Sequence, residues 1–362
     1  MRAAVTRKGR LIVDQVPDPI PAEGQLLVAP LATGICGSDL HALGDFDHFI
    51  ELAASQGLDA LDSSKDMIFG HEFCAEILEN GPGTTGALPL GTRVCSIPLV
   101  FGSTGIEQIG YSHLYPGAMG ERMILQEMFV LPVPDSVPTD LAALTEPLAV
   151  GEHAVGLADI EQGQPALVVG CGPVGLAVIA ALRARGLGPI IAADFSPTRR
   201  SLAESFGVDE VIDPAELSPH SRWTEMGIPM TLMDRVMAQA LGSAASAPVI
   251  FEAVGIPGMI QSTFTTCPLE VASSSSVCAC TVTALSPSQP SQRSSSCDSA
   301  SATQARSSQA PWPALRPGFP APLSWSRRSS DSTRLLRLSP SSLHPANRAR
   351  SSSTPEERKL LR

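Results

Sequence analysis

A glycine-rich stretch in the middle of the chain constrains the fold more than any other feature. Residues 165–169 (Pro-Ala-Leu-Val-Val) are typical of a buried strand, and a Gly-x-Gly-x-x-Gly pattern follows at residues 170–175. An apolar helix is expected over 176–185 and a second strand over 190–193, which ends at Asp194. The glycine pattern alone is weak evidence, but with an acidic residue about 20 positions on it predicts a dinucleotide-binding βαβ unit.

Each glycine of this pattern meets a different structural requirement. Gly170 permits the tight turn, Gly172 lets the backbone approach the pyrophosphate, and Gly175 lets the helix pack on the strand. Free N–H groups at the helix N-terminus would bind the phosphates. The candidate dinucleotide contacts are Gly170, Gly172, Pro173, Val174, Gly175, Asp194, Arg199 and Val254, the last at the end of a fourth strand over 248–255.

Asp194 predicts which dinucleotide is bound. Its carboxylate would accept hydrogen bonds from the adenosine ribose hydroxyls and repel a 2′-phosphate, so NAD is favoured. Arg199 and Arg200 follow within six residues and leave NADP open as the alternative.

A second group of polar residues precedes this unit in the sequence. Residues 34–41 (Gly-Ile-Cys-Gly-Ser-Asp-Leu-His) hold a thiol, a hydroxyl, a carboxylate and an imidazole, and His71, Glu72 and Glu146 follow. Cys, His and carboxylate are the ligands of a catalytic zinc that keeps one coordination position open. Cys36 by itself is more typical of a small buried cysteine. The whole set, followed by a dinucleotide fingerprint, predicts a metal site.

The length, net charge, apolar runs and cysteine content of the chain exclude several classes of function. A length of 362 residues has room for two domains, and the net charge of −11 argues against a nucleic-acid or anionic-membrane partner. We expect no signal peptide and no membrane span, because no apolar run reaches about 18 residues. The eight scattered cysteines fit a reducing compartment, so a cytoplasmic location is expected.

The sequence before the βαβ unit predicts short strands. Three prolines and a glycine between residues 17 and 24 separate apolar runs, which suggests a partly open β-barrel. An insert over 42–69 has helical spacing, and either it lies near the mouth of the site or it is a surface helix with one buried face. Residues 95–120 contain only Cys95, so a four-cysteine structural zinc lobe cannot form there. In the same loop, Tyr111, His113 and Tyr115 either line a pocket or are ordinary loop residues.

Residues 1–268 resemble the zinc-dependent medium-chain dehydrogenases, especially the alcohol, polyol and threonine dehydrogenases. The resemblance rests on four motifs in order: residues 34–41, residues 70–72 (Gly-His-Glu), residues 146–150 (Glu-Pro-Leu-Ala-Val) and the fingerprint at 170–175. It implies an α/β protein with a GroES-like, partly open β-barrel catalytic domain over 1–150. A Rossmann doubly wound NAD-binding domain over 151–268 would follow, truncated at its fourth strand.

The resemblance also implies the metal ligands. Cys36 and His71 would bind one catalytic zinc, with Glu72 as a third or exchangeable ligand. Glu146 would bind the zinc directly or through its water. No structural zinc is expected.

The implied chemistry is zinc-dependent oxidation of a small alcohol or polyol, with hydride transfer to NAD. Ser38 would hold the substrate hydroxyl and pass its proton towards His41, and Asp39 would orient His71. The family further implies a homo-oligomer, whose usual subunit edge lies in the C-terminal region.

That C-terminal region is where the sequence changes character. The net charge is −18 up to Pro268 and +7 from Leu269 onwards, and about a quarter of the residues over 269–362 are serine. Such a composition predicts a disordered tail. Back-translating residues 269–280 with chosen codons and reading one base earlier gives Gly-Gly-Arg-Ile-Val-Val-Val-Gly-Val-Cys-Met, a glycine turn and a buried strand. Our hypothesis is that a frameshift near Pro268 has replaced the native C-terminus; the alternative is a genuine Ser/Pro-rich tail.

Two other functions fit parts of the sequence. A truncated pseudoenzyme would at most bind zinc or dinucleotide, and the tail favours that interpretation. A zinc-free quinone or enoyl reductase of the same superfamily would keep the dinucleotide unit, but Cys36, His71 and Glu72 argue against it. The basic tail lacks interleaved aromatic residues, so nucleic-acid binding is not expected.

Overall fold

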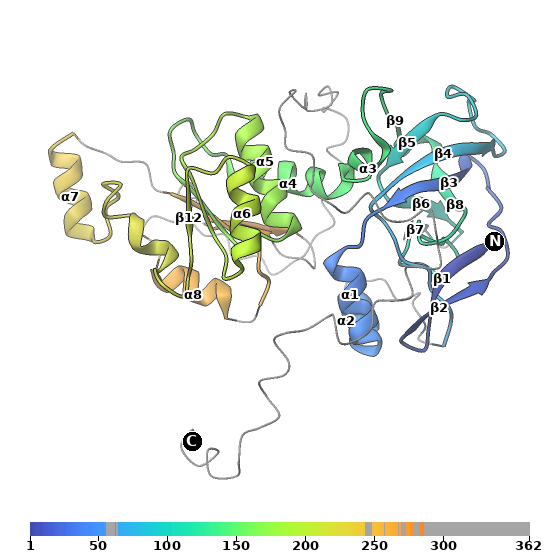
Figure 1. The fold of residues 1–362 in the computed structure, drawn as a ribbon, viewed down its shortest axis with the longest axis horizontal. Coiled ribbons are helices and arrows are strands. Elements are labelled where there is room, and N and C mark those ends of the chain that lie inside the picture. The colour runs from blue at the N-terminus through green and yellow to red at the C-terminus, as the bar shows by residue number, and fades with distance from the viewer. Residues whose placement is uncertain are drawn as a thin grey trace, which may run out of the picture. The chain divides into compact units, whose positions relative to one another are not determined.

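The computed structural model describes residues 1–55, 62, 64–103, 105–242, 248–256, 258–266, 268, 273–277 and 282–285. Two sheet-based regions account for most of them (Figure 1). Among these residues, none of the helices is long and apolar enough to cross a membrane.

The N-terminal region is built from antiparallel strands. Its five-stranded sheet has the order β8-β3-β4-β5-β9, and two hairpins, β1-β2 and β6-β7, accompany it. The strands are β1 (Arg2–Arg7), β2 (Arg10–Gln15), β3 (Gln25–Thr33), β4 (Phe73–Asn80), β5 (Arg93–Ser96), β6 (Leu99–Gly102), β7 (Gly105–Gln108), β8 (Met123–Gln126) and β9 (Val130–Pro132), with a 3₁₀ turn at Glu127–Phe129. Val28, Ile77 and Val94 lie in the buried core of this region. The predicted β-barrel region is therefore present.

Among the described residues between β3 and β4 there are two helices, the second of which lies within the insert. They are α1 (Gly37–Gly44) and α2 (Phe46–Ser55). Phe46 packs with Met67, Phe69 and Tyr111 in a separate cluster, with Phe49 against it. The predicted helix of the insert is confirmed over the described residues, and one of its faces is buried.

The second region is a parallel sheet covered by helices. Strands β12, β11, β10 and β13 pair in parallel in that order. The elements are α3 (Thr139–Ala142), α4 (Thr145–Ala158), β10 (Ala166–Val169), α5 (Pro173–Ala184), β11 (Ile190–Ala193), α6 (Pro197–Ser205), β12 (Glu210–Ile212), a 3₁₀ turn (Pro219–Arg222), α7 (Leu232–Ala240), β13 (Val249–Glu252) and α8 (Met259–Thr266). This is the predicted Rossmann arrangement of strands and helices.

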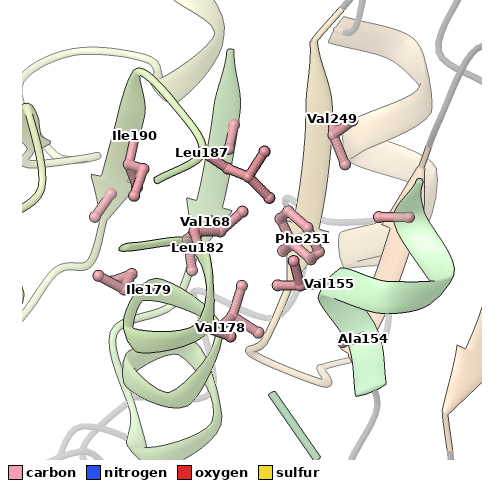
Figure 2. Close-up of a cluster of buried hydrophobic side chains, with 14 of the residues drawn as sticks. Ala154, Val155, Val168, Val178, Ile179, Leu182, Leu187, Ile190, Val249 and Phe251 are labelled. Carbon is pink, nitrogen blue, oxygen red and sulfur yellow. The ribbon is translucent and has the colours of Figure 1, made fainter. Parts of the chain in front are cut away.

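Both faces of this sheet are buried, as expected for parallel strands. Figure 2 shows one face, where Val168 of β10 and Phe251 of β13 meet α5 residues Val178 and Leu182. On the other face, Leu167 of β10 packs with a separate cluster that includes the fully buried Trp223. Burial on both sides explains why the strands read as continuous apolar runs.

The edge of the sheet beyond β13 differs from the prediction. We expected the sheet to end at its fourth strand, yet β15 (Val282–Leu285) pairs with β13, and β14 (Ser273–Val277) pairs with β15. Both pairings are antiparallel. For β14 and β15 this follows from the short stretch of chain between them, because a parallel pair needs a crossover of a dozen or more residues. These two strands lie within the segment 269–362, for which we predicted disorder. The remainder of that segment lies outside the described residues.

Candidate active site

Three of the predicted metal ligands come together in the N-terminal region. One donor atom each of Cys36, His71 and Glu72 lies within 4.8 Å of the others. The pairing of β3 with β4 explains this, because it runs up to Thr33 and Phe73 and continues as a bond from Gly34 N to Glu72 O (2.7 Å). Cys36, which follows β3 closely, and His71 and Glu72, which directly precede β4, therefore lie close together.

A glycine makes room for the carboxylate of this cluster. A Cβ atom on Gly34 would lie 2.1 Å from Oε2 and 2.9 Å from Cβ of Glu72, both closer than real contacts. Any larger residue at position 34 would displace the Glu72 side chain. Gly34, the first of the two glycines of the 34–41 motif, is thus required by the position of Glu72.

The cluster is buried and electrostatically unusual. Burial lowers the pKa of His71, but Asp39 and Cys36 outweigh this effect and raise it to about 10. His71 Nδ1 lies 3.5 Å from Asp39 Oδ1, an ion-pair distance that leaves this buried nitrogen without a hydrogen bond. Burial, and then the charge of Cys36, raises the pKa of Glu72 to about 7.

These properties fit a bound zinc ion. A thiol, an imidazole and a carboxyl group gathered in a buried site are groups that bind a divalent cation, and a binding cation displaces protons from such ligands. The donor set also matches the three protein ligands of a catalytic zinc. The residues present therefore fit the metal predicted from the sequence.

Glu146 lies near this cluster but is not part of it. It is half-buried in the first turn of α4. Burial raises its pKa, His71 lowers it, and the charges of Glu72 and Asp39 raise it further, so its carboxyl group is within electrostatic reach of the cluster. The structure thus brings together three of the four predicted ligands and leaves Glu146 as a neighbour.

The three predicted catalytic residues, Ser38, Asp39 and His41, differ in burial and in hydrogen-bond partners. Asp39 is buried, and its Oδ2 accepts a hydrogen bond from Cys36 N (3.1 Å). The Ser38 hydroxyl is within 2.7 Å of the Tyr111 hydroxyl. His41 is exposed in α1, and the hydrogen bonds of the described residues link Ser38 to Tyr111 and not to His41.

Tyr111 is the functional candidate that the sequence left undecided. Its hydroxyl lies 2.7 Å from Ser38 Oγ and 2.9 Å from Asp39 Oδ1, and burial strongly raises its pKa. Its neighbours in the loop lie elsewhere, because His113 Nε2 accepts a bond from Asp62 N and Tyr115 packs against the barrel core. The position of aromatic residues in a glycine-rich loop was the sequence feature that suggested a pocket-lining role. That feature did not distinguish Tyr111 from Tyr115.

The dinucleotide fingerprint has the expected turn. Gly170 has a φ of +94° after β10, and Pro173 begins α5. A Cβ atom on Gly175 would lie 1.8 Å from Gly170 O, whereas one on Gly172 would have no atom within 4 Å. The third glycine is therefore required by the fold, and the second leaves open space of the kind that a pyrophosphate would fill.

The other dinucleotide candidates lie around this turn. A Cβ atom on Gly170 would lie 2.8 Å from Val254 Cγ2, so Val254 lies directly against the turn. Asp194 is buried after β11, and its Oδ2 accepts a bond from Cys171 N (2.9 Å). Arg199 is exposed, with Nη1 3.6 Å from Asp194 Oδ2. The predicted residues thus share one end of the parallel sheet.

Comparison with known proteins identifies the family. The zinc-binding dehydrogenase model matches residues 173–268, and the alcohol dehydrogenase GroES-like domain model matches residues 22–135. The chain is 31% identical over 258 residues to (R,R)-butanediol dehydrogenase of Bacillus subtilis, which is 69% of each protein. It is 31% identical over 231 residues to the sorbitol dehydrogenase of the same organism, covering 60% of this chain and 62% of that protein.

A solved structure agrees with these matches. The crystal structure of 2R,3R-butanediol dehydrogenase from Bacillus subtilis has a TM-score of 0.55 and 25% identity, and the match covers 74% of this chain and 75% of that one. The curated relatives are matched over about two thirds of their own length. The resemblance and the fold class predicted from the motifs are thereby confirmed, and the chain belongs to the zinc-type medium-chain alcohol dehydrogenase family.

Proposed function

We propose that this chain oxidises a small alcohol or polyol and transfers the hydride to NAD at a site that holds one zinc ion. The observation that carries the proposal is the cluster of Cys36, His71 and Glu72, whose donor atoms lie within 4.8 Å of one another. The Ser38 hydroxyl is joined to this cluster through Tyr111 and Asp39, so a hydrogen-bonding group for a substrate lies beside the metal ligands.

Each residue has a role in this proposal. Cys36, His71 and Glu72 bind the zinc, and Glu146 approaches it from α4, directly or through a water. When bound, zinc polarises the substrate oxygen and the nicotinamide accepts the hydride. Ser38 holds the substrate hydroxyl and, on receiving its proton, gives up its own, which points at Tyr111 beforehand and would leave towards the exposed His41 once the hydroxyl turns.

Asp39 has a positioning role. Its carboxylate accepts from Cys36 N and lies 3.5 Å from His71 Nδ1, so it fixes the backbone of one ligand and the ring of another. Such partners orient metal ligands and keep them basic.

NAD is the proposed dinucleotide. Asp194 stands at the end of β11 with a carboxylate that would meet the adenosine ribose and repel a 2′-phosphate. Arg200 is engaged by Asp213 (2.8 Å), which leaves Arg199 as the residue that would favour NADP. A single zinc is proposed because Cys95, the one cysteine of residues 95–120, lies in β5, where it is buried and donates to Ala142 O (3.1 Å).

We also propose three segments: a GroES-like domain over 1–150, a truncated Rossmann domain over 151–268, and an out-of-frame tail over 269–362. The end of the zinc-binding dehydrogenase match at residue 268 supports this boundary. Sequencing the source DNA across the codons for residues 259–280 tests it. One base gained or lost would restore the Gly-Gly-Arg-Ile-Val-Val-Val reading, and an unchanged sequence would make the Ser/Pro-rich tail genuine.

The function is tested on the purified chain. Elemental analysis should find about one zinc per chain, and NADH should form with butane-2,3-diol, sorbitol or L-threonine. The variant Cys36→Ser should lose both the zinc and the turnover. Zinc without any NADH formation would support a pseudoenzyme, and quinone reduction without zinc would support the metal-free reductase.

A further inference from the structure

Tyr111 links the loop after β7 to the candidate catalytic residues. Its side chain is 9% exposed, and its hydroxyl lies 2.7 Å from Ser38 Oγ and 2.9 Å from Asp39 Oδ1. Both distances are ordinary for O–H···O hydrogen bonds. One phenol group therefore contacts two neighbouring residues of the 34–41 motif at once.

The number of protons fixes the direction of these bonds. A phenol carries a single proton, and the Tyr111 hydroxyl donates it to Asp39 Oδ1, a carboxyl oxygen that is a better acceptor than a serine hydroxyl. The short contact to Ser38 then requires the serine hydroxyl to donate to the Tyr111 oxygen. With its own proton directed at Tyr111, Ser38 presents only lone pairs to any other partner.

The ring of Tyr111 is held by aromatic neighbours. Its centroid lies 5.3 Å from that of Phe49 in α2, 5.8 Å from Phe69 and 5.2 Å from the ring of His71. Aromatic pairs at these separations stabilise a particular arrangement of the rings. The insert between β3 and β4 therefore contributes to where the Tyr111 hydroxyl lies.

We propose that Tyr111 is a positioning residue for alcohol oxidation, which sets Ser38 as a hydrogen-bond acceptor for the substrate hydroxyl. This inference rests on the proposed dehydrogenase function. An alcohol that donates to Ser38 has its oxygen lone pairs free to face the metal-ligand cluster. Without Tyr111, the Ser38 hydroxyl rotates freely and can donate to the substrate oxygen, which leaves the substrate proton without an acceptor.

The kinetic test uses a double-mutant cycle. Tyr111→Phe keeps the ring and removes the hydroxyl, and kcat/KM should fall about tenfold, the equivalent of one hydrogen bond of about 1.4 kcal/mol. In a Ser38→Ala background the same change should have little further effect, because Tyr111 acts through Ser38. Additive effects, or an unchanged kcat/KM for Tyr111→Phe, would overturn the proposal.

The chain supplies a matched control. It contains only two tyrosines, and Tyr115 packs on the barrel core in the same loop. Tyr115→Phe should leave kcat/KM unchanged. Zinc content measured in all variants separates the proposal from a role through Asp39, because loss of zinc in Tyr111→Phe would show that the tyrosine supports the metal ligands and not Ser38.

A second measurement does not depend on turnover. Tyrosine labelled with ¹³C at Cζ should give two NMR signals, and Tyr115→Phe assigns them. Ser38→Ala should shift the Tyr111 signal and leave the Tyr115 signal in place. An unmoved Tyr111 signal would disprove the hydrogen bond itself. If the signal shifts but no alcohol is oxidised, the contact is real and the proposed dehydrogenase function fails.

Discussion

The metal-ligand cluster and the outer edge of the parallel sheet are organised by different kinds of interaction. The cluster is formed where β3 and β4 pair, by residues separated by fewer than 40 positions. At the sheet edge, the parallel series β12-β11-β10-β13 changes to antiparallel pairing at β15 and β14. The first region brings three of its four predicted donors together, and the second departs from the parallel pattern of its own sheet.

The difference follows from how each kind of pairing is connected. An antiparallel neighbour needs only a short turn, whereas a further parallel strand needs a crossover of a dozen or more residues, usually with a helix. After β13 the chain has α8 and then two short strands that can pair only as a hairpin. The three candidate metal ligands thus come from described residues before 268, whereas the sheet of the dinucleotide region includes β14 and β15 from after it.

The largest expected effect tests whether the sheet core is complete up to β13. Phe251→Ala removes a fully buried ring that Figure 2 shows among residues from β10, α5 and α4, and it should cost about 3–5 kcal/mol of unfolding free energy. Urea unfolding measures this cost. The control Leu241→Ala, at a side chain that is 74% exposed, should change stability by under about 0.5 kcal/mol.

A cost for Phe251→Ala as small as that of the control would mean that the core around β13 is not packed. The irregular packing of the outer sheet edge would then extend inward to β13, and the contrast with the metal-ligand cluster would be larger than the structure indicates.

The next prediction concerns the cluster alone. Gly34→Ala places a methyl group where Glu72 Oε2 lies, so the carboxylate must move and zinc affinity should fall about tenfold to a hundredfold. Competition with a chelator measures the affinity. Gly44→Ala is the control, because its Cβ would meet no atom within 4 Å. Equal affinities in both variants would remove Glu72 from the metal site.

The sequence predicted the cluster well for a physical reason. Cys36, His71 and Glu72 belong to short motifs, and the strand pairing that joins these motifs can be expected from alternating apolar patterns. Tyr111 could not be assigned in the same way. Its contact with Ser38 depends on how a loop after β7 packs against the insert, and no local pattern encodes that distance.

The sheet edge was harder to predict than the fold of the domain. The βαβ unit follows from glycine positions, since Gly175 has room only for a hydrogen atom beside Gly170 O. The strands β14 and β15 lie in a Ser-rich segment whose composition predicts disorder. No alternation of apolar and polar residues over 273–277 indicates a strand there, so the pairing could not be expected from the sequence.

A smaller effect is expected at the second glycine of the fingerprint. Gly172→Ala has space for its methyl group in the protein, so stability should not change, but the methyl group would occupy the path of the pyrophosphate. The Kd for NAD should rise about tenfold, or 1.4 kcal/mol. Gly175→Ala provides the contrast, because it should lower the unfolding free energy itself. Unchanged NAD binding in Gly172→Ala would place the dinucleotide elsewhere.

The smallest effects are expected at the sheet edge. Proline removes one backbone N–H donor. At Ala284 of β15, which pairs with both Phe251 and Ser274, it should cost about 1 kcal/mol. At Ser274 in the outermost strand it should cost under about 0.5 kcal/mol. Hydrogen exchange at the amide of Phe251 provides a local measurement, and it should accelerate in Ala284→Pro more than in Ser274→Pro. If neither variant changes stability or exchange, the hairpin contributes nothing and the sheet effectively ends at β13, which is what the composition of the tail predicted.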